Sequence, residues 1–349
     1  MDGSCAPGGA DSIQVRSVVA KRPSLLSLDM SQQDSATLIG YRPIPPSPAS
    51  GGLLWGLVGV IAFSFSIPLT RVAVAGGGLP PLFVGAGRAV VAAALAGFAL
   101  IITRQALPRG TQWIRVALVA SGVVIGFPVL TSFALTSATA SHGAVVIALL
   151  PVATAVVAVR RGGERPPLRF WLAAVAGALA AVAFAVIQGG GIGSLQLSDL
   201  LLFGAVVAAA VGYAEGGLLS RELGAWQTIS WALIVAFPVM LVLTACSARG
   251  GLHSTANGWL AFVYLGVVSM YLGFFAWYRG LAIGPMTTVS QVQLAQPVFG
   301  IAWAALLLGE HIGWSTIIGG LAVIACAVLA VRTRTVRPTS ARTRATRDG

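Results

Sequence analysis

The sequence has few charged residues. Only 9% of its 349 residues are Asp, Glu, Lys or Arg, against about 25% in a typical soluble domain. Hydrophobic residues make up 56%. A soluble globule with so little charge could not cover its surface with polar groups. The composition therefore excludes a cytosolic enzyme, a disordered chain and a nucleic-acid-binding module, and it predicts an integral membrane protein.

Lysine and cysteine are also scarce. Lys21 is the only lysine, and no glycine lies near it, so the glycine-rich loop with lysine that holds nucleotide phosphates is absent. This excludes an internal ATPase. The three cysteines, Cys5, Cys246 and Cys326, lie far apart without a CxxC pattern, and the three histidines form no HExxH pattern. We expect no cofactor, no metal site and no catalytic residues.

The N-terminal segment differs from the rest of the chain. Residues 1–50 are rich in Ser, Pro, Gly and Asp and contain no apolar run long enough to span a membrane. They also lack the apolar core of a signal peptide. We predict a disordered cytoplasmic tail at 1–50, and a second, basic cytoplasmic tail at 332–349.

A series of apolar segments follows the N-terminal tail. A helix needs about 20 residues to cross a bilayer, and within lipid it pairs all of its own backbone groups. We therefore predict an all-α integral membrane protein with ten transmembrane helices. These are 53–70, 82–103, 113–134, 142–159, 168–187, 198–219, 226–246, 257–279, 286–308 and 312–331.

Arginine is distributed unevenly between the two sides that these ten spans define. With the N-terminus inside, fifteen arginines fall on inner connections and the C-terminal tail, whereas Arg71 and Arg249 alone fall on outer ones. Positive residues collect on the cytoplasmic side of membrane proteins. The count predicts a multi-pass protein of the inner (cell) membrane with both termini in the cytoplasm.

The chain contains an internal repeat at an offset of 146 residues. Pro151-Val152 and Gly163-Glu164 recur as Pro297-Val298 and Gly309-Glu310. The halves predicted from it are 51–187 and 198–331. Five helices in each half would make the second half enter the membrane upside down. Such inverted repeats are typical of secondary transporters, whose site lies between the halves.

Several motifs resemble one family. Leu53-Leu54-Trp55-Gly56 opens the first span, Gly-Leu-Pro-Pro-Leu leads to Arg88 in the second, and Ala134-Leu135-Thr136-Ser137-Ala138 precedes the fourth. Together with the duplicated Pro…Glu unit, they resemble the EamA-like branch of the drug/metabolite transporter superfamily over residues 52–331. The resemblance implies a ten-helix carrier that moves a small metabolite.

Two ionisable residues lie inside spans away from their ends, and such residues are functional candidates. Arg88 and Glu215 differ by roughly 16 Å in depth, so we expect no direct ion pair. Arg88 either contacts substrate or extends outward to the interface. Glu215 either binds a proton or cation or anchors the inner interface beside Arg221. A stripe of small residues lies next to Glu215 and predicts close helix approach: Gly204, Ala208, Gly212 and Gly216.

A polar face precedes Pro297. Ser290, Gln293 and Gln296 share one helical face, whereas their counterparts in the first half are Ala144, Ile147 and Leu150. Buried amides are costly in lipid unless they are paired. We predict that the two glutamines line the transport path, unless they serve hydrogen bonding between helices.

Aromatic residues form a further candidate group. Tyr271 lies at mid-membrane, where its hydroxyl needs a partner. Together with Trp55, Phe275, Trp277 and Tyr213 it would form an aromatic wall for a partly apolar substrate, unless these rings serve packing alone.

The duplicated prolines and glutamates have mainly structural interpretations. Pro151 and Pro297 are predicted to lie in mid-helix and to kink their helices, either as plain bends or to free a carbonyl for substrate. Glu164 and Glu310 each precede a helix, and we expect these carboxylates to complement a positive helix end.

We therefore expect a secondary transporter that works by alternating access, with efflux of a metabolite or drug driven by an ion gradient or by exchange. Arg88 as the only basic residue in the path favours a neutral, zwitterionic or cationic substrate over the phosphates of a sugar-phosphate or nucleotide-sugar exchanger. The sequence is also compatible with an intramembrane enzyme and with a signalling or scaffold protein. The expected partners are a small-molecule substrate, the lipid bilayer and a coupling proton or cation, not nucleic acid, and a homodimer stays open.

Overall fold

The computed structural model describes residues 49–76, 78–162, 167–188, 196–283 and 289–333. These residues form helices and short connections, without strands. Nearly all of the two predicted tails lies outside the described residues, and so does Glu164.

Eight helical stretches are long and apolar enough to cross a membrane, by length and composition. They are Gly51–Gly76, Pro81–Ile102, Gln112–Ala134, Ala140–Arg161, Leu168–Ile187, Leu197–Leu223, Ala225–Ala248 and Ala256–Ile283. Two shorter apolar helices, Val292–Leu308 and Trp314–Ala330, overlap the ninth and tenth predicted spans. The described residues thus confirm an all-helical, multi-pass fold.

Several stretches are divided into shorter helices. In the first half of the chain the helices are α2 (Ala49–Ser64), α3 (Ser66–Arg71), η1 (Val72–Gly76), α4 (Pro81–Ile102), α5 (Gln112–Val119), η2 (Ala120–Gly126), α6 (Phe127–Ala134), α7 (Ala140–Ile147), α8 (Leu150–Gly162) and α9 (Leu168–Gln188). In the second half they are α10 (Leu197–Leu223), α11 (Ala225–Ala248), α12 (Ala256–Tyr264), η3 (Leu265–Leu272), α13 (Gly273–Ile283), η4 (Ser290–Ala295), α15 (Gln296–Leu308) and α16 (Trp314–Thr333). Irregular turns therefore occur inside apolar stretches, where only protein-buried backbone is tolerated.

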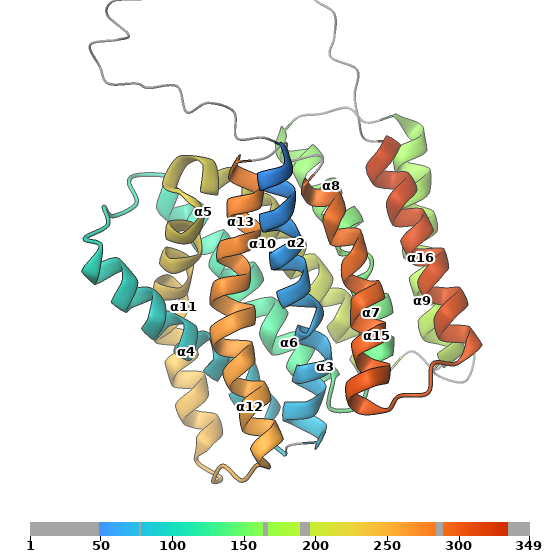
Figure 1. Ribbon diagram of the computed structural model, residues 1–349, viewed down its shortest axis with the longest axis horizontal. Coiled ribbons are helices and arrows are strands. Elements are labelled where there is room, and N and C mark those ends of the chain that lie inside the picture. Colours follow the sequence, from blue (N-terminus) through green and yellow to red (C-terminus); the bar gives the residue numbers. More distant parts are fainter. Residues whose placement is uncertain (1–48, 77, 163–166, 189–195, 284–288, 334–349) are drawn as a thin grey trace, which may run out of the picture. The chain divides into compact units, whose positions relative to one another are not determined.

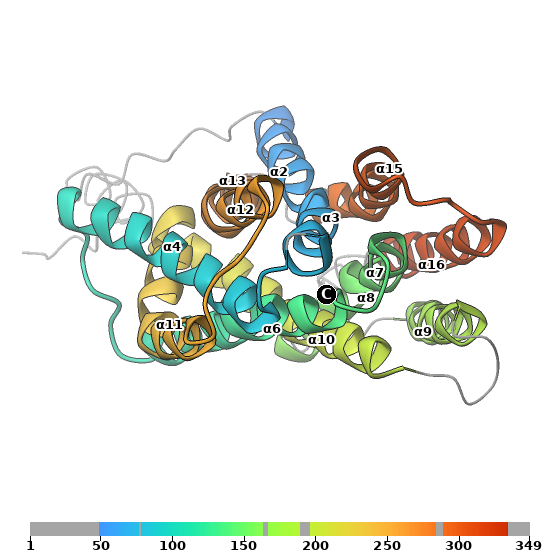
Figure 2. The same ribbon diagram turned by 90° about the horizontal axis from the view of Figure 1, so that it is seen from below.

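Helices from the two halves pack in a reciprocal pattern. α4 lies against α11 and α9 lies against α16, and each of these pairs is related by the 146-residue offset (Figures 1 and 2). Two further contacts between the halves are exchanged: α2 packs against α13, while α10 packs against α5, η2 and α6. The first span, which contains α2, thus contacts the eighth, which contains α13. The sixth span, α10, contacts the third, which contains α5, η2 and α6. A two-fold relation between the repeats produces this pattern.

Glycines make both exchanged contacts close. A Cβ atom on Gly122 of η2 would overlap the Ala208 carbonyl oxygen and lie 2.9 Å from the Gly212 nitrogen of α10. A Cβ atom on Gly280 of α13 would lie 2.7 Å from the Gly56 nitrogen of α2. The close approach predicted for the small-residue stripe of α10 is therefore confirmed.

The duplicated prolines stand at the start of helices. After α7 the hydrogen bonding changes to the tighter 3₁₀ type, in which the Leu149 N–H donates to the Val146 carbonyl at 3.1 Å. Pro151 follows in the first turn of α8. Pro297 likewise falls in the first turn of α15, directly after the 3₁₀ helix η4. Each proline also lies inside a longer apolar helical stretch, Ala140–Arg161 or Val292–Leu308, so the bends expected there stay a prediction. A first turn tolerates proline best, because the missing N–H needs no partner there.

Candidate functional site

The bundle has two chemically different ends. Arginines cluster where α4, α8, α10 and α13 finish, and we call this the basic end. The helices α8 and α13 finish at the top of Figure 1. Its arginines include Arg104, Arg160, Arg161, Arg221 and Arg279. The other end, where α7, α10 and α12 begin, is called the opposite end.

Two buried glutamines lie at the junction of η4 and α15. Gln293 is 3% exposed and Gln296 is 6% exposed. Among the described residues, Gln293 Nε2 and Gln296 Oε1 have no hydrogen-bond partner. The same holds for Oγ1 of Thr154 on α8, a helix that packs against η4. An unpaired buried polar group costs about 1–3 kcal/mol, so these groups would gain from a polar ligand. Ser290 begins η4, and its side chain lies outside the described part.

Arg88 is enclosed by protein and does not extend to the interface. It is 1% exposed on α4, which packs against α6 and η3. Its guanidinium donates to Thr131 Oγ1 at 3.4 Å, while its Nε has no partner among the described atoms. As predicted, it does not pair with Glu215. A buried guanidinium held by one long hydrogen bond retains donors for another acceptor.

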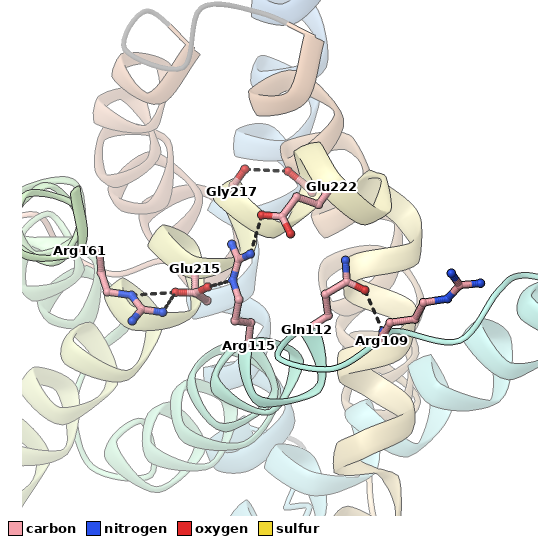
Figure 3. A network of polar contacts seen from close by, with 8 residues as sticks. Arg109, Gln112, Arg115, Arg161, Glu215, Gly217 and Glu222 are labelled. Carbon is pink, nitrogen blue, oxygen red and sulfur yellow. Dashed lines mark hydrogen bonds and ion pairs between the residues drawn. The ribbon is translucent and has the colours of Figure 1, made fainter. Parts of the chain in front are cut away.

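Glu215 joins the two halves at the basic end (Figure 3). One carboxylate oxygen accepts a hydrogen bond from Arg115 Nε on α5, and the other accepts from Arg161 Nε on α8 at 2.9 Å. Arg115 also binds Glu222, which lies two turns further along α10. The sequence placed Glu215 beside Arg221, but its cations come from the first half of the chain. Both oxygens are occupied in a carboxylate that is only 3% exposed.

A contact between a histidine and a carboxylate at the opposite end was not predicted from the sequence. His142 Nε2 of α7 lies 2.7 Å from Asp199 Oδ1 of α10. Asp199 Oδ2 also accepts the Gln196 N–H at 2.9 Å and so caps its own helix. The available signal was weak, because His142 and Asp199 each occupy a helix start and are 57 residues apart.

Glu310 caps a helix of the other half. Its carboxylate oxygens accept the N–H groups of Ala140 at 2.7 Å and Ser141 at 2.9 Å, at the start of α7. These contacts are with the start of α7, whereas the sequence had suggested the start of the following helix, α16. Two unpaired N–H groups and the positive helix end together favour a carboxylate at this position.

The predicted aromatic wall is divided into two groups. Tyr271, Phe275 and Trp226 line a mainly apolar cavity of about 250 Å³. The ring of Trp55 packs against that of Phe275, with the ring centroids 5.5 Å apart. The Tyr271 hydroxyl pairs with Ser230 Oγ at 3.3 Å. Trp277 and Tyr213 belong instead to a buried cluster, which also contains Phe63, Phe274 and Tyr278. The prediction that these residues form a single aromatic wall is wrong. Phe275 and Trp277 are two residues apart, so they point to different sides of one helix.

A third aromatic group was not predicted, at the break between α2 and α3. Phe65 stacks on Trp303 of α15 with ring centroids 4.4 Å apart. Trp303 Nε1 donates to Ser64 Oγ at 2.9 Å, and the Tyr264 hydroxyl donates to the Ala62 carbonyl at 3.2 Å. The break in the first span is therefore packed and hydrogen-bonded by second-half helices.

The fold and these contacts define a multi-pass helical membrane protein with two repeated halves. Comparison with known proteins gives the family. The profile of the EamA-like transporter family matches residues 50–186 and again residues 196–332, so both limits of the match recur at the 146-residue offset. The chain belongs to the EamA-like transporter family.

Individual relatives agree with this assignment. The chain is 44% identical over 291 residues to a Bacillus subtilis (strain 168) protein named "Uncharacterized transporter YdeK", covering 81% of this chain and 98% of the relative. A solved structure titled "Crystal structure of protein" matches with a TM-score of 0.57 at 19% identity, covering 82% of this chain and 98% of that one. This structural likeness concerns the fold alone.

Proposed function

We propose that the chain is a secondary transporter that moves a small metabolite or drug-like molecule by alternating access between halves 51–187 and 198–331. In this proposal η4 with α15, and then α16, are the ninth and tenth spans. The observation that carries it is the pair of buried glutamines whose amide atoms lack partners at the start of α15. Membership of a transporter family supports it as well.

The binding chemistry favours an uncharged, hydrogen-bonding or zwitterionic substrate. Gln293 Nε2 offers a donor, and Gln296 Oε1 and Thr154 Oγ1 offer acceptors. Arg88 is held by Thr131 and by no carboxylate among the described residues, so it is suited to the carboxylate of a zwitterion. A phosphorylated sugar would need several basic residues at this depth, which disfavours a sugar-phosphate exchanger.

Alternating access requires that the halves join at one end while they separate at the other. The contacts of Glu215 with Arg115 and Arg161 close the basic end, because they tie α10 to α5 and α8. Opening that end would separate three charges that are bound to one another. We propose that the basic end faces the cytoplasm, because positive residues collect on that side of a membrane. We also propose that transport runs outward, as efflux driven by an ion gradient or by exchange.

The test is untargeted metabolite profiling of cells and medium for cells that lack the protein and cells that overproduce it. Overproduction should move at least one metabolite from the cells to the medium. The double variant Gln293→Leu, Gln296→Leu should abolish that change, because it removes the polar partners of the substrate. Gln227→Leu is the matched control, since Gln227 pairs with Gln105 at the basic end and should leave the effect intact.

Different outcomes would indicate a different class of protein. Unchanged metabolite pools with a loss-of-function phenotype would favour a signalling or scaffold protein. A new product that replaces a substrate within one compartment would favour an intramembrane enzyme. Wild-type export by the double variant would reject the proposed site while leaving transport intact.

A further inference from the structure

His142 and Asp199 form a contact between the halves at the opposite end of the bundle. His142 lies in the first turn of α7 and Asp199 in the first turn of α10, and they are 9% and 2% exposed. A carboxylate only accepts hydrogen bonds, so the ring nitrogen that faces it at 2.7 Å carries a hydrogen. A further proton taken up by this ring therefore binds at Nδ1.

A polar cavity lies beside this pair and connects it with the surroundings of the opposite end. It has a volume of about 190 Å³. The polar side chains in its wall are Ser137, Thr139, His142, Gln196, Ser198 and Asp199. A cavity of this size and polarity accommodates water, which can deliver a proton to the ring.

Within the described ranges, the helices packed against α7 bring few charged groups near His142. Asp199 faces it from α10, and Glu310, before α16, accepts two N–H groups of the same first turn of α7. Arg71 of α3 binds the carbonyls of Leu135 and Thr136, just before α7. The helix α9 presents the ring of Phe184 with centroids 5.1 Å apart, and α15 contains no charged residue. Arg169 of α9 and Arg332 of α16 lie at the basic end, and His311 beside Glu310 is exposed.

Protonation changes the strength of this contact. Histidine is the side chain whose charge ordinarily changes between about pH 5 and 8. Its neutral ring makes an ordinary hydrogen bond to Asp199, and its charged ring makes a charge-assisted bond that is roughly twice as strong. The first-turn N–H groups of α7 would otherwise repel a cation, but Glu310 binds two of them.

We propose that His142 and Asp199 form the proton-binding site that couples transport to pH. A proton taken up from the opposite end binds α7 to α10 and closes that end, and its release lets the halves separate there. This inference rests on the transporter function proposed above. Because each half supplies one member of the pair, proton binding and closure of this end favour each other.

The test needs no substrate and uses the full-length protein in detergent or nanodiscs. Spin labels are attached at Thr136→Cys and Leu200→Cys, two exposed positions on the two halves at this end, in a background without Cys5, Cys246 and Cys326. Pulsed electron paramagnetic resonance then gives the distance distribution from pH 8 to pH 5.5. We expect the ratio of short to long distances to rise about tenfold on acidification.

Variants assign this response to one histidine. His142→Gln keeps a hydrogen-bond donor for Asp199 but cannot gain charge, so its distances should not depend on pH, and Asp199→Asn should behave likewise. His253→Gln and His311→Gln change the other two histidines of the chain and should respond as the wild type does.

A wild-type distribution that stays constant with pH, or a pH response that persists in His142→Gln, would overturn the proposal. Should His142→Gln fail to fold, as judged by gel filtration, His142→Asn and the wild-type titration with its two histidine controls decide the matter. The metabolite-export assay is independent of this outcome, so a constant distribution alongside intact export would reject the coupling site alone.

Discussion

The two ends of α10 carry the same type of residue in two different settings. Glu215 near the basic end binds two arginines, and Asp199 near the opposite end binds one histidine, all from the first half. Arginine stays charged at every physiological pH, whereas histidine gains and loses its charge. The comparison indicates that one contact between the halves is permanent in charge and the other responds to protons.

Neither Asp199 nor Glu215 has an acidic counterpart in the other repeat. At the 146-residue offset, Asp199 corresponds to Leu53 and Glu215 to Leu69. The helices that make the two exchanged contacts are thus equivalent in packing but not in charge. The repeat accounts for the architecture, and the residues present in only one half carry the candidate chemistry.

The largest expected effect is the loss of the buried carboxylate at the basic end. Glu215→Gln removes the negative charge and one of the two oxygens that Arg115 and Arg161 use, so both cations lose their counter-ion, and we expect a loss of about 3 kcal/mol of stability. Thermal unfolding in detergent measures it. Glu222→Gln is the control: Glu222 is 47% exposed and should cost less than about 1 kcal/mol. Equal melting temperatures for the two variants would contradict a buried, shared carboxylate.

The next effect concerns the glycine contact between α10 and η2. A Cβ atom on Gly212 would lie 2.5 Å from Val123 Cγ1 and 3.0 Å from the Val123 nitrogen. Gly212→Ala should therefore cost about 1–3 kcal/mol through overpacking. Gly204→Ala meets only the flexible end of Leu130 at 3.3 Å and should cost clearly less in the same unfolding assay. The reverse order would show that the close approach at Gly212 has been misassigned.

The smallest expected effect concerns Glu310. Glu310→Gln keeps an acceptor but loses the charge that complements α7, so we expect a loss of about 0.5–1 kcal/mol. Hydrogen exchange should be faster at the Ala140 and Ser141 amides and unchanged along α16. Faster exchange confined to the start of α16 would show instead that Glu310 caps α16, the helix that follows it. His311→Gln is the neighbouring control.

Sequence patterns predicted what depends on composition and spacing. The apolar segments, the repeat and the small-residue stripe of α10 are all visible as residue types at regular intervals. The stripe was interpretable because Gly212 and Ala208 lie on one helical face whatever their partner is. Likewise, the polarity of Gln293 and Gln296 was conspicuous because their counterparts are apolar.

Contacts between distant segments were beyond these patterns. Arg161 looked like an ordinary cytoplasmic flank, yet it reaches Glu215, 54 residues away. Glu310 was assigned to the nearest helix in sequence, and the chain instead folds it onto α7, 169 and 170 residues away. The aromatic set failed for a local reason, since the faces of a single helix had to be separated before its rings could be grouped.

The most direct test of alternating access compares both ends in one experiment. Spin labels at Thr111→Cys and Arg221→Cys report on the basic end, and labels at Thr136→Cys and Leu200→Cys report on the opposite end. Releasing the basic end with Glu215→Gln should lengthen the first distance and shorten the second. Two distances that both lengthen, or that both stay unchanged, would contradict a carrier whose halves rock about a central site.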